Sequence, residues 1–95
     1  MKYSRSLFPE NDICYVCGRH GTEIHHVFFG PYRSKSEKWG LKVRLCRTHH
    51  ESIPYGVHGG NRELDLRLKK DAQARFEQKY GHGKFMQEFN RNYLE

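Results

Sequence analysis

The chain has 95 residues, of which 36% are hydrophobic and 29% are charged, and its formal net charge is +6. A chain of this length forms one small domain in which the apolar core alone gives marginal stability. No apolar run approaches 18 residues and no signal-peptide hydrophobic region is present. This excludes a membrane-spanning or exported protein, so we expect a soluble, cytoplasmic one.

The first third of the chain predicts an arm, a turn and a strand. Residues 1–12 are polar and lack periodicity, which predicts a loosely held arm. Residues 14–18 form a short turn in which Gly18 tolerates the backbone geometry that two closely spaced ligands need. Residues 22–29 are rich in β-branched and aromatic side chains, and this composition predicts a β-strand.

The middle of the chain predicts the second half of a β-hairpin. Residues 31–40 contain Pro, Ser, Lys and Gly and predict a loop. Residues 41–45 alternate apolar with basic side chains, which predicts a second short strand. A short helix is expected after this strand, through about Ile53, where Pro54 stops it.

The last third predicts helices. Apolar side chains recur every four residues from Leu64 to Tyr80, with Asn61 as the N-cap and Gly81 as the C-terminal stop. A final amphipathic segment around Phe85 is expected to pack back on the domain. The fold class expected is a small α+β zinc-bound single domain over residues 1–95, in which residues 61–95 form a helical extension.

The side chains best suited to bind a metal ion are those of three cysteines and seven histidines. An odd number of cysteines fits metal ligation better than a disulfide framework. Cys14, Cys17, Cys46 and His49 follow the pattern C-x2-C-x28-C-x2-H, in which each x2 gap lets two ligands reach one ion from a single turn. His20 could replace His49, but its spacing from Cys17 matches no half-site, so we expect His20 at the surface. The pattern predicts a closed structural Zn²⁺ site.

Further histidines lie beside this pattern and are not needed for it. His25 and His26 end the first predicted strand, and adjacent strand residues point to opposite faces. His50 follows the last zinc ligand, so a helix that crosses the hairpin would bring His25 and His50 within reach of a second ion. Such an ion, with a neutral imidazole nearby to accept a proton from water, can hydrolyse a phosphodiester. The alternative is that these histidines serve packing or belong to a larger zinc cluster.

The ordered combination of C-x2-C, a strand ending in H-H, and L-C-x2-H-H resembles the HNH endonucleases. The resemblance covers residues 13–58, about half of the chain. It implies a ββα-metal core, in which a hairpin and a helix surround one catalytic ion. The ending L-C-R-T-H-H with a later G-V-H is more similar to phage-encoded HNH proteins, including the recombination-enhancement type.

The resemblance implies a role for each of the remaining histidines. His25 and His50 take the places of metal ligands, and His26 takes the place of the general base. His58 lies in the Gly-rich loop where similar phage sequences also carry a His, and it is expected as a further metal ligand or a phosphate contact. The catalytic ion expected is Mg²⁺, Mn²⁺, Ni²⁺ or Zn²⁺, because imidazole ligands suit several of these metals.

Two departures from the family pattern stand out. The middle Asn of the family would fall near Leu41, where this chain has none, so backbone or another group must orient the base. His49 stands where the fourth zinc cysteine usually lies, which leaves open whether His49 and His50 exchange roles. Glu23 shares a strand face with His25 and is a candidate to hold its tautomer, although an exposed strand acid is the commoner case.

The function expected is metal-dependent hydrolysis of DNA by an HNH-type endonuclease. The alternative is a non-catalytic zinc-ribbon module that binds DNA. The chain would act as a monomer or homodimer, alone or with a phage packaging or recombination protein, in the host cytoplasm if phage-encoded.

Tyr32 and Trp39 are candidates to stack on DNA. Six basic residues between the metal-ligand pairs, against one acid, are expected to contact DNA phosphates: Arg33, Lys35, Lys38, Lys42, Arg44 and Arg47.

Overall fold

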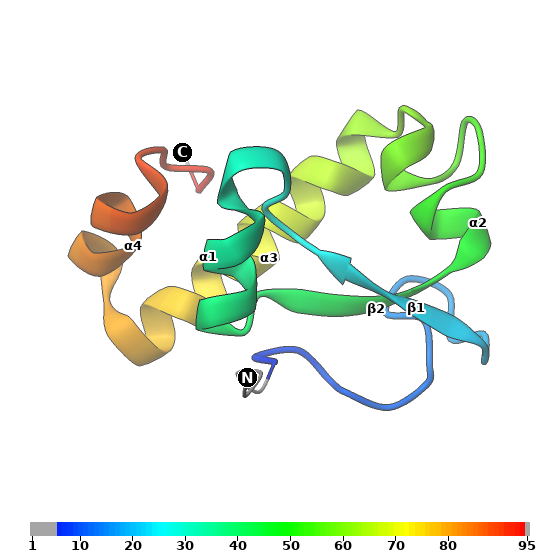
Figure 1. Cartoon of the computed structure of the whole chain (residues 1–95), viewed down its shortest axis with the longest axis horizontal. Helices are drawn as coiled ribbons and strands as arrows, with labels where there is room; N and C mark the ends of the chain where they lie inside the picture. Colours follow the sequence, from blue (N-terminus) through cyan, green and yellow to red (C-terminus); the bar gives the residue numbers. More distant parts are fainter. Residues whose placement is uncertain (1–5, 95) are drawn as a thin grey trace.

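A computed structural model describes residues 6–94 of the chain. A two-stranded antiparallel sheet crosses the molecule, the longest helix runs diagonally along it, and shorter helices lie at both ends (Figure 1). None of the helices in the described range is long and apolar enough to cross a membrane. The elements are β1 (Thr22–His26), η1 (Gly30–Tyr32), α1 (Arg33–Trp39), β2 (Lys42–Cys46), α2 (Arg47–His50), η2 (Val57–Gly59), α3 (Arg62–Tyr80) and α4 (His82–Phe89).

The predicted hairpin is confirmed, with shorter strands than expected. In the register of β1 and β2, His25 faces Val43 and His26 faces Lys42. The first strand ends at His26 rather than residue 29, because Val27 and Phe28 turn into the core, where they are 0% and 2% exposed. The end of β1 therefore lies at the edge of the hydrophobic core.

The loop predicted over residues 31–40 was wrong, because residues 33–39 form helix α1. Ser36 is fully buried in this helix, and its hydroxyl accepts from the Phe28 amide (2.9 Å) and donates to the Phe28 carbonyl (2.7 Å). Gly40 ends the helix at φ 72°, a left-handed conformation that suits glycine. The two strands are thus joined by a helix that is fastened to the exit of β1.

The loosely held arm predicted over residues 1–12 was also wrong for its described part, residues 6–12; residues 1–5 lie outside the described range. Phe8 is only 3% exposed and its ring packs edge-on against Tyr15. The Leu7 amide donates to the Gly40 carbonyl at 2.7 Å, and the Ser6 hydroxyl donates to the Lys42 carbonyl. The arm packs along the start of β2.

The C-terminal helices follow the prediction. The Asn61 side chain accepts from the Leu64 amide at 3.0 Å and so caps α3, as expected. The α4 residues Phe85 and Phe89 pack their rings against Phe28, with centroids 5.7 and 4.5 Å apart. The core is thus closed between the exit of β1 and α4. Its fully buried side chains include Val27, Leu41, Leu45, Leu68, Ala72, Phe76 and Phe85.

The helix after Cys46 is shorter than predicted. Helix α2 ends at His50, not near Ile53. The chain then turns through a glycine-rich segment and a single 3-10 turn, η2, before α3 begins. In Figure 1, α2 and this segment lie at the end of the hairpin opposite α4.

Candidate metal centres

The four residues predicted as zinc ligands lie together. The Sγ atoms of Cys17 and Cys46 are 3.7 Å apart, and Nδ1 of His49 lies 3.3 Å from Sγ of Cys46 and 3.7 Å from Sγ of Cys14. All four ligand atoms lie within 4.8 Å of one another. Tetrahedral Zn–S and Zn–N bonds place ligand atoms about 3.6–3.8 Å apart. The cluster therefore has the ligand types and the spacing to bind a metal such as zinc.

Backbone contacts hold the two halves of this cluster in place. The Gly18 amide donates to the Cys14 carbonyl at 2.9 Å, which closes the turn that carries Cys14 and Cys17. The Tyr15 amide donates to the Arg44 carbonyl at 2.8 Å and fastens this turn to β2. Cys46 ends β2, so a strand end and a turn meet at the metal position.

The electrostatics of the cluster also fit a bound cation. Burial raises the pKa of Cys14, but backbone hydrogen bonds from Cys46, Cys17 and Val16 outweigh it and lower the pKa to about 6. Burial raises the pKa of the Cys46 thiol, and the neighbouring thiols of Cys17 and Cys14 raise it further. Thiols this close resist joint ionisation unless a cation balances the charge.

A second cluster contains His25, His50 and His58. Their ring centroids form a nearly equilateral triangle, with sides of 5.2, 5.1 and 5.0 Å. One nitrogen from each ring lies within 4.8 Å of the other two. The structure therefore brings together all three residues expected to hold a second ion, from β1, α2 and η2.

His25 is the buried member of this three-histidine cluster. It is 1% exposed, and among the described residues its Nε2 has no hydrogen-bond partner. A buried polar atom without a partner costs about 1–3 kcal/mol, so such atoms are rare and call for a ligand. Burial, followed by the charges of His50 and His58, lowers the pKa of His25 to about 3. His25 is therefore a neutral imidazole with a free nitrogen, the form that binds metals.

His50 is oriented by a carboxylate. Its Nδ1 lies 2.9 Å from Oε1 of Glu23, which leaves Nε2 as the nitrogen for an ion. Glu23, which the sequence offered either as a partner of His25 or as an exposed strand acid, is exposed and contacts His50 of α2. A carboxylate that holds a ligating histidine is a common feature of metal sites.

Two glycines bring His58 to this cluster. A Cβ on Gly56 would lie 2.6 Å from the Glu51 nitrogen, and a Cβ on Gly59 would lie 2.2 Å from the Ser52 oxygen. The segment after α2 therefore folds against the end of that helix more closely than any side chain would permit. This close approach sets His58 beside His50.

Replacing Gly59 with Ala is expected to disturb the second cluster. The new methyl group forces the backbone around His58 away from Ser52, which should lower the free energy of unfolding by about 1–3 kcal/mol. Binding of a second equivalent of Ni²⁺ or Zn²⁺, measured by calorimetry, should weaken. In the control Gly83→Ala, the added carbon meets nothing within 4 Å, and metal binding should be unchanged. Equal second-ion affinity in both variants would contradict the role of this close approach.

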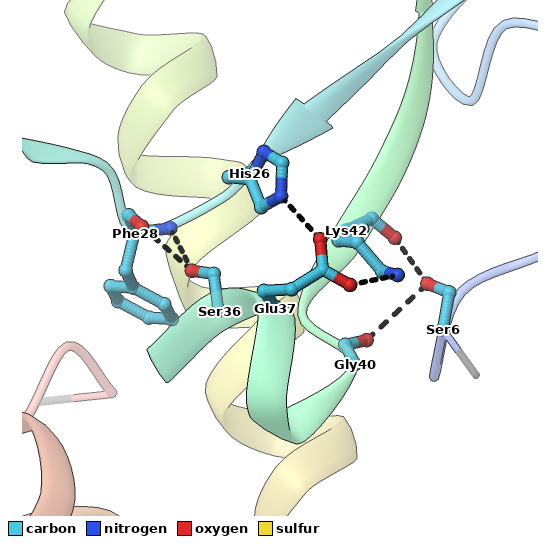
Figure 2. Close-up of polar contacts among 7 residues, drawn as sticks. All are labelled: Ser6, His26, Phe28, Ser36, Glu37, Gly40 and Lys42. Atoms are coloured by element: carbon cyan, nitrogen blue, oxygen red, sulfur yellow. Dashed lines mark hydrogen bonds and ion pairs between the residues drawn. The ribbon is translucent and has the colours of Figure 1, made fainter. Parts of the chain in front are cut away.

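His26, the residue expected as general base, belongs to neither cluster. It lies on the opposite face of β1 from His25, as strand alternation requires, and its side chain is 14% exposed. Its Nε2 lies 2.9 Å from Oε1 of Glu37 on α1 (Figure 2). The sequence does not reveal the role of Glu37, because the composition of residues 31–40 predicts a loop and Glu37 is only the one acid in a basic stretch.

The six basic residues expected to contact DNA lie on three elements, α1, β2 and α2. Arg33 and Arg47 are exposed at the starts of α1 and α2. Lys35 donates to the Glu88 carbonyl at 2.6 Å, and Lys42 forms an ion pair with Glu37 at 2.8 Å. The remaining two, Lys38 on α1 and Arg44 on β2, lie on different elements from Arg47. The side chains of Lys35 and Lys42 therefore also make contacts within the domain.

The two aromatic residues named as stacking candidates pack within the fold. The Trp39 indole donates to Glu88 at 2.7 Å and lies against the ring of Tyr80. The Tyr32 ring lies 5.9 Å from that of Phe89. These rings connect η1 and α1 to the C-terminal helices. His20 is exposed, as predicted.

Comparison of the chain with protein-family models, with curated proteins and with solved structures finds no match.

Proposed function

We propose that the protein is a metal-dependent endonuclease of HNH type that hydrolyses DNA phosphodiester bonds. The observation that carries this proposal is the three-histidine cluster, in which Nε2 of buried His25 has no partner among the described residues, next to His26, which belongs to neither of the two clusters. A metal site alone would account for His25 but not for a separate, carboxylate-held imidazole on the neighbouring residue. The hairpin β1–β2 with α2 would then be the ββα-metal core.

In this proposal the two clusters have different tasks. Zn²⁺ on the Cys14, Cys17, Cys46 and His49 cluster stabilises the fold and needs no open position. His25, His50 and His58 would hold a second divalent ion, which would supply positive charge that stabilises the phosphodiester during hydrolysis. Three imidazoles leave further positions of that ion available, as catalytic sites require.

His26 acts as the general base. Its ring accepts a proton from a water molecule whose oxygen forms the new bond to phosphorus, while the bond from phosphorus to the 3′-oxygen breaks. That oxygen takes a proton from solvent. An imidazole with a pKa of about 6.5 in water is suited to this task near neutral pH. His26 also lines an open hollow that contains Arg33, whose guanidinium suits a DNA phosphate.

A plasmid-nicking assay with the zinc-loaded chain and added Mg²⁺, Mn²⁺, Ni²⁺ or Zn²⁺ tests the proposal. Wild-type protein is expected to cut, and His26→Ala is expected to cut about 10²–10⁴-fold more slowly because it lacks the base. Folding and DNA binding should be kept in this variant, as judged by circular dichroism and fluorescence anisotropy. His82→Ala is the matched control, because His82 also pairs with a glutamate but lies on α4.

The alternative, a zinc-ribbon module that only binds DNA, gives the opposite results. It predicts no cutting under any metal and unchanged DNA affinity in His26→Ala, since no step needs a base. A folded wild type that binds DNA and never cuts it, across a broad range of metals and pH, would overturn the endonuclease proposal. Cutting by His26→Ala at the wild-type rate would remove the assigned base.

A further inference from the structure

The group that contacts His26 comes from the helix between the two strands. His26 and Lys42 face each other in the register of the hairpin, so their side chains share one face of the sheet. Glu37 of α1 reaches over this face and contacts both, with Oε1 2.9 Å from Nε2 of His26 and Oε2 2.8 Å from Nζ of Lys42. Figure 2 shows the carboxylate between the two side chains. Each carboxylate oxygen thus has its own partner.

Helix α1 has little freedom to move away from this position. The residue before Glu37, Ser36, is fully buried and exchanges two hydrogen bonds with the backbone of Phe28. Two residues after Glu37, the Trp39 indole donates to Glu88 at 2.7 Å. Glu37 therefore lies between two anchored residues, and its carboxylate is presented by rigid backbone, not by a mobile loop.

The contact determines which nitrogen of His26 can act. An ionised carboxylate only accepts hydrogen bonds, so Nε2 of His26 must carry the proton that faces Glu37. Burial raises the pKa of Glu37, but hydrogen bonds from Lys42 and His26 outweigh it and hold the pKa below the ordinary value. The neutral ring then leaves Nδ1 without a proton. In Figure 2 the second ring nitrogen lies on the side of the ring away from Glu37.

We propose that Glu37 is a positioning residue that fixes the tautomer and the orientation of His26, with Lys42 holding the carboxylate in place. The inference rests on the proposed nuclease function, in which His26 is the base. Glu37 touches no substrate and acts through the imidazole alone. The ion pair with Lys42 explains why a basic residue of the hairpin is turned toward α1, and it keeps the carboxylate from rotating away.

Kinetics and nuclear magnetic resonance together test this role. In Glu37→Ala the rate constant for cleavage of bound DNA is expected to fall about 10–100-fold, the size typical of lost outer-shell carboxylates. KM for DNA should stay the same, because no DNA contact is removed. The ¹⁵N shifts of the His26 ring should change from the Nε2–H tautomer to a mixture. In Glu37→Gln the single amide oxygen can accept from either Nε2 of His26 or Nζ of Lys42, so the Nε2–H tautomer and the rate should be recovered only in part.

Glu77→Gln is the matched control, because Glu77 forms the same kind of pair with His82 away from the hairpin. It should leave the rate and the His26 ring signals unchanged. An unaltered His26 tautomer in Glu37→Ala would overturn the inference. An increase in KM with no change in the rate constant for cleavage would also overturn it. A wild type with the Nε2–H tautomer that never cuts DNA would overturn the proposed function instead, and the two failures are therefore distinguishable.

Discussion

Replacing Cys46 with Ser is expected to unfold most of the domain at room temperature. Structural zinc contributes about 10–16 kcal/mol in zinc-finger peptides, whereas a domain of this kind has a net stability of only about 5–15 kcal/mol. A loss of about 3 kcal/mol alone would lower Tm by about 12–24 °C for a domain of this size. Cys46 also ends β2 and is 5% exposed, so a misplaced side chain disturbs the core as well. Thermal unfolding followed by circular dichroism measures the effect.

His20→Ala is the control for this change. His20 is exposed and lies near the zinc turn without belonging to the cluster, so its loss should change neither Tm nor zinc content. Removing zinc from the wild type with a chelator should reproduce the Cys46→Ser result, and added Zn²⁺ should reverse it. Full zinc content and an unchanged Tm in Cys46→Ser would show that this cluster does not stabilise the fold.

In the proposed endonuclease, replacing His25 with Leu is expected to abolish cleavage and, at the same time, to stabilise the protein that carries only one equivalent of Zn²⁺. The substitution removes a metal ligand, and it also removes a buried nitrogen that has no partner among the described residues. Leu is similar in volume and fully apolar, so the free energy of unfolding should rise by about 1–3 kcal/mol. A second equivalent of metal should raise Tm in the wild type but not in this variant.

Gln73→Leu is the contrasting case. Gln73 is also fully buried, but its amide donates to Glu77 and Asn92 and its oxygen accepts from the Tyr93 amide. The three partners are only partly buried, but the loss of these hydrogen bonds should still lower the free energy of unfolding by about 1–3 kcal/mol. If His25→Leu destabilises the one-zinc protein as Gln73→Leu does, this result would contradict the idea that Nε2 of His25 binds an ion.

The sequence was most informative where the spacing of ligands or of apolar side chains is local. The two x2 gaps predicted the Cys14, Cys17, Cys46 and His49 cluster, because two residues separated by one turn must meet. The four-residue repeat predicted α3 from its cap to its end, since helix periodicity depends only on neighbouring residues.

The sequence did not predict the elements whose position depends on contacts between distant residues. Helix α1 has seven residues and is too short to be stable by propensity alone. Its position depends on Ser36 reaching the backbone of Phe28 and on Trp39 packing against α3, and neither contact is visible in a local pattern. The polar composition of residues 6–12 predicts a loosely held arm, yet the buried side chain of Phe8 fastens this segment to the core.

The same limit applies to the candidate site. Strand alternation placed His25 and His26 on opposite faces correctly, but the partners Glu23 and Glu37 come from pairings that cross between elements. The approach of His58 depends on two glycines that the composition identified only as a loop. Local chemistry therefore predicted which side chains matter, and tertiary contacts determined which groups orient them.

One peptide bond joins the two metal clusters, because His49 belongs to the first and His50 to the second. Consecutive Cα atoms are about 3.8 Å apart, and this spacing does not stretch. Any shift of α2 therefore moves one residue of each cluster together. A substitution that displaces α2 should accordingly weaken metal binding at both clusters, whereas His25→Leu and Gly59→Ala should weaken it at the second cluster alone.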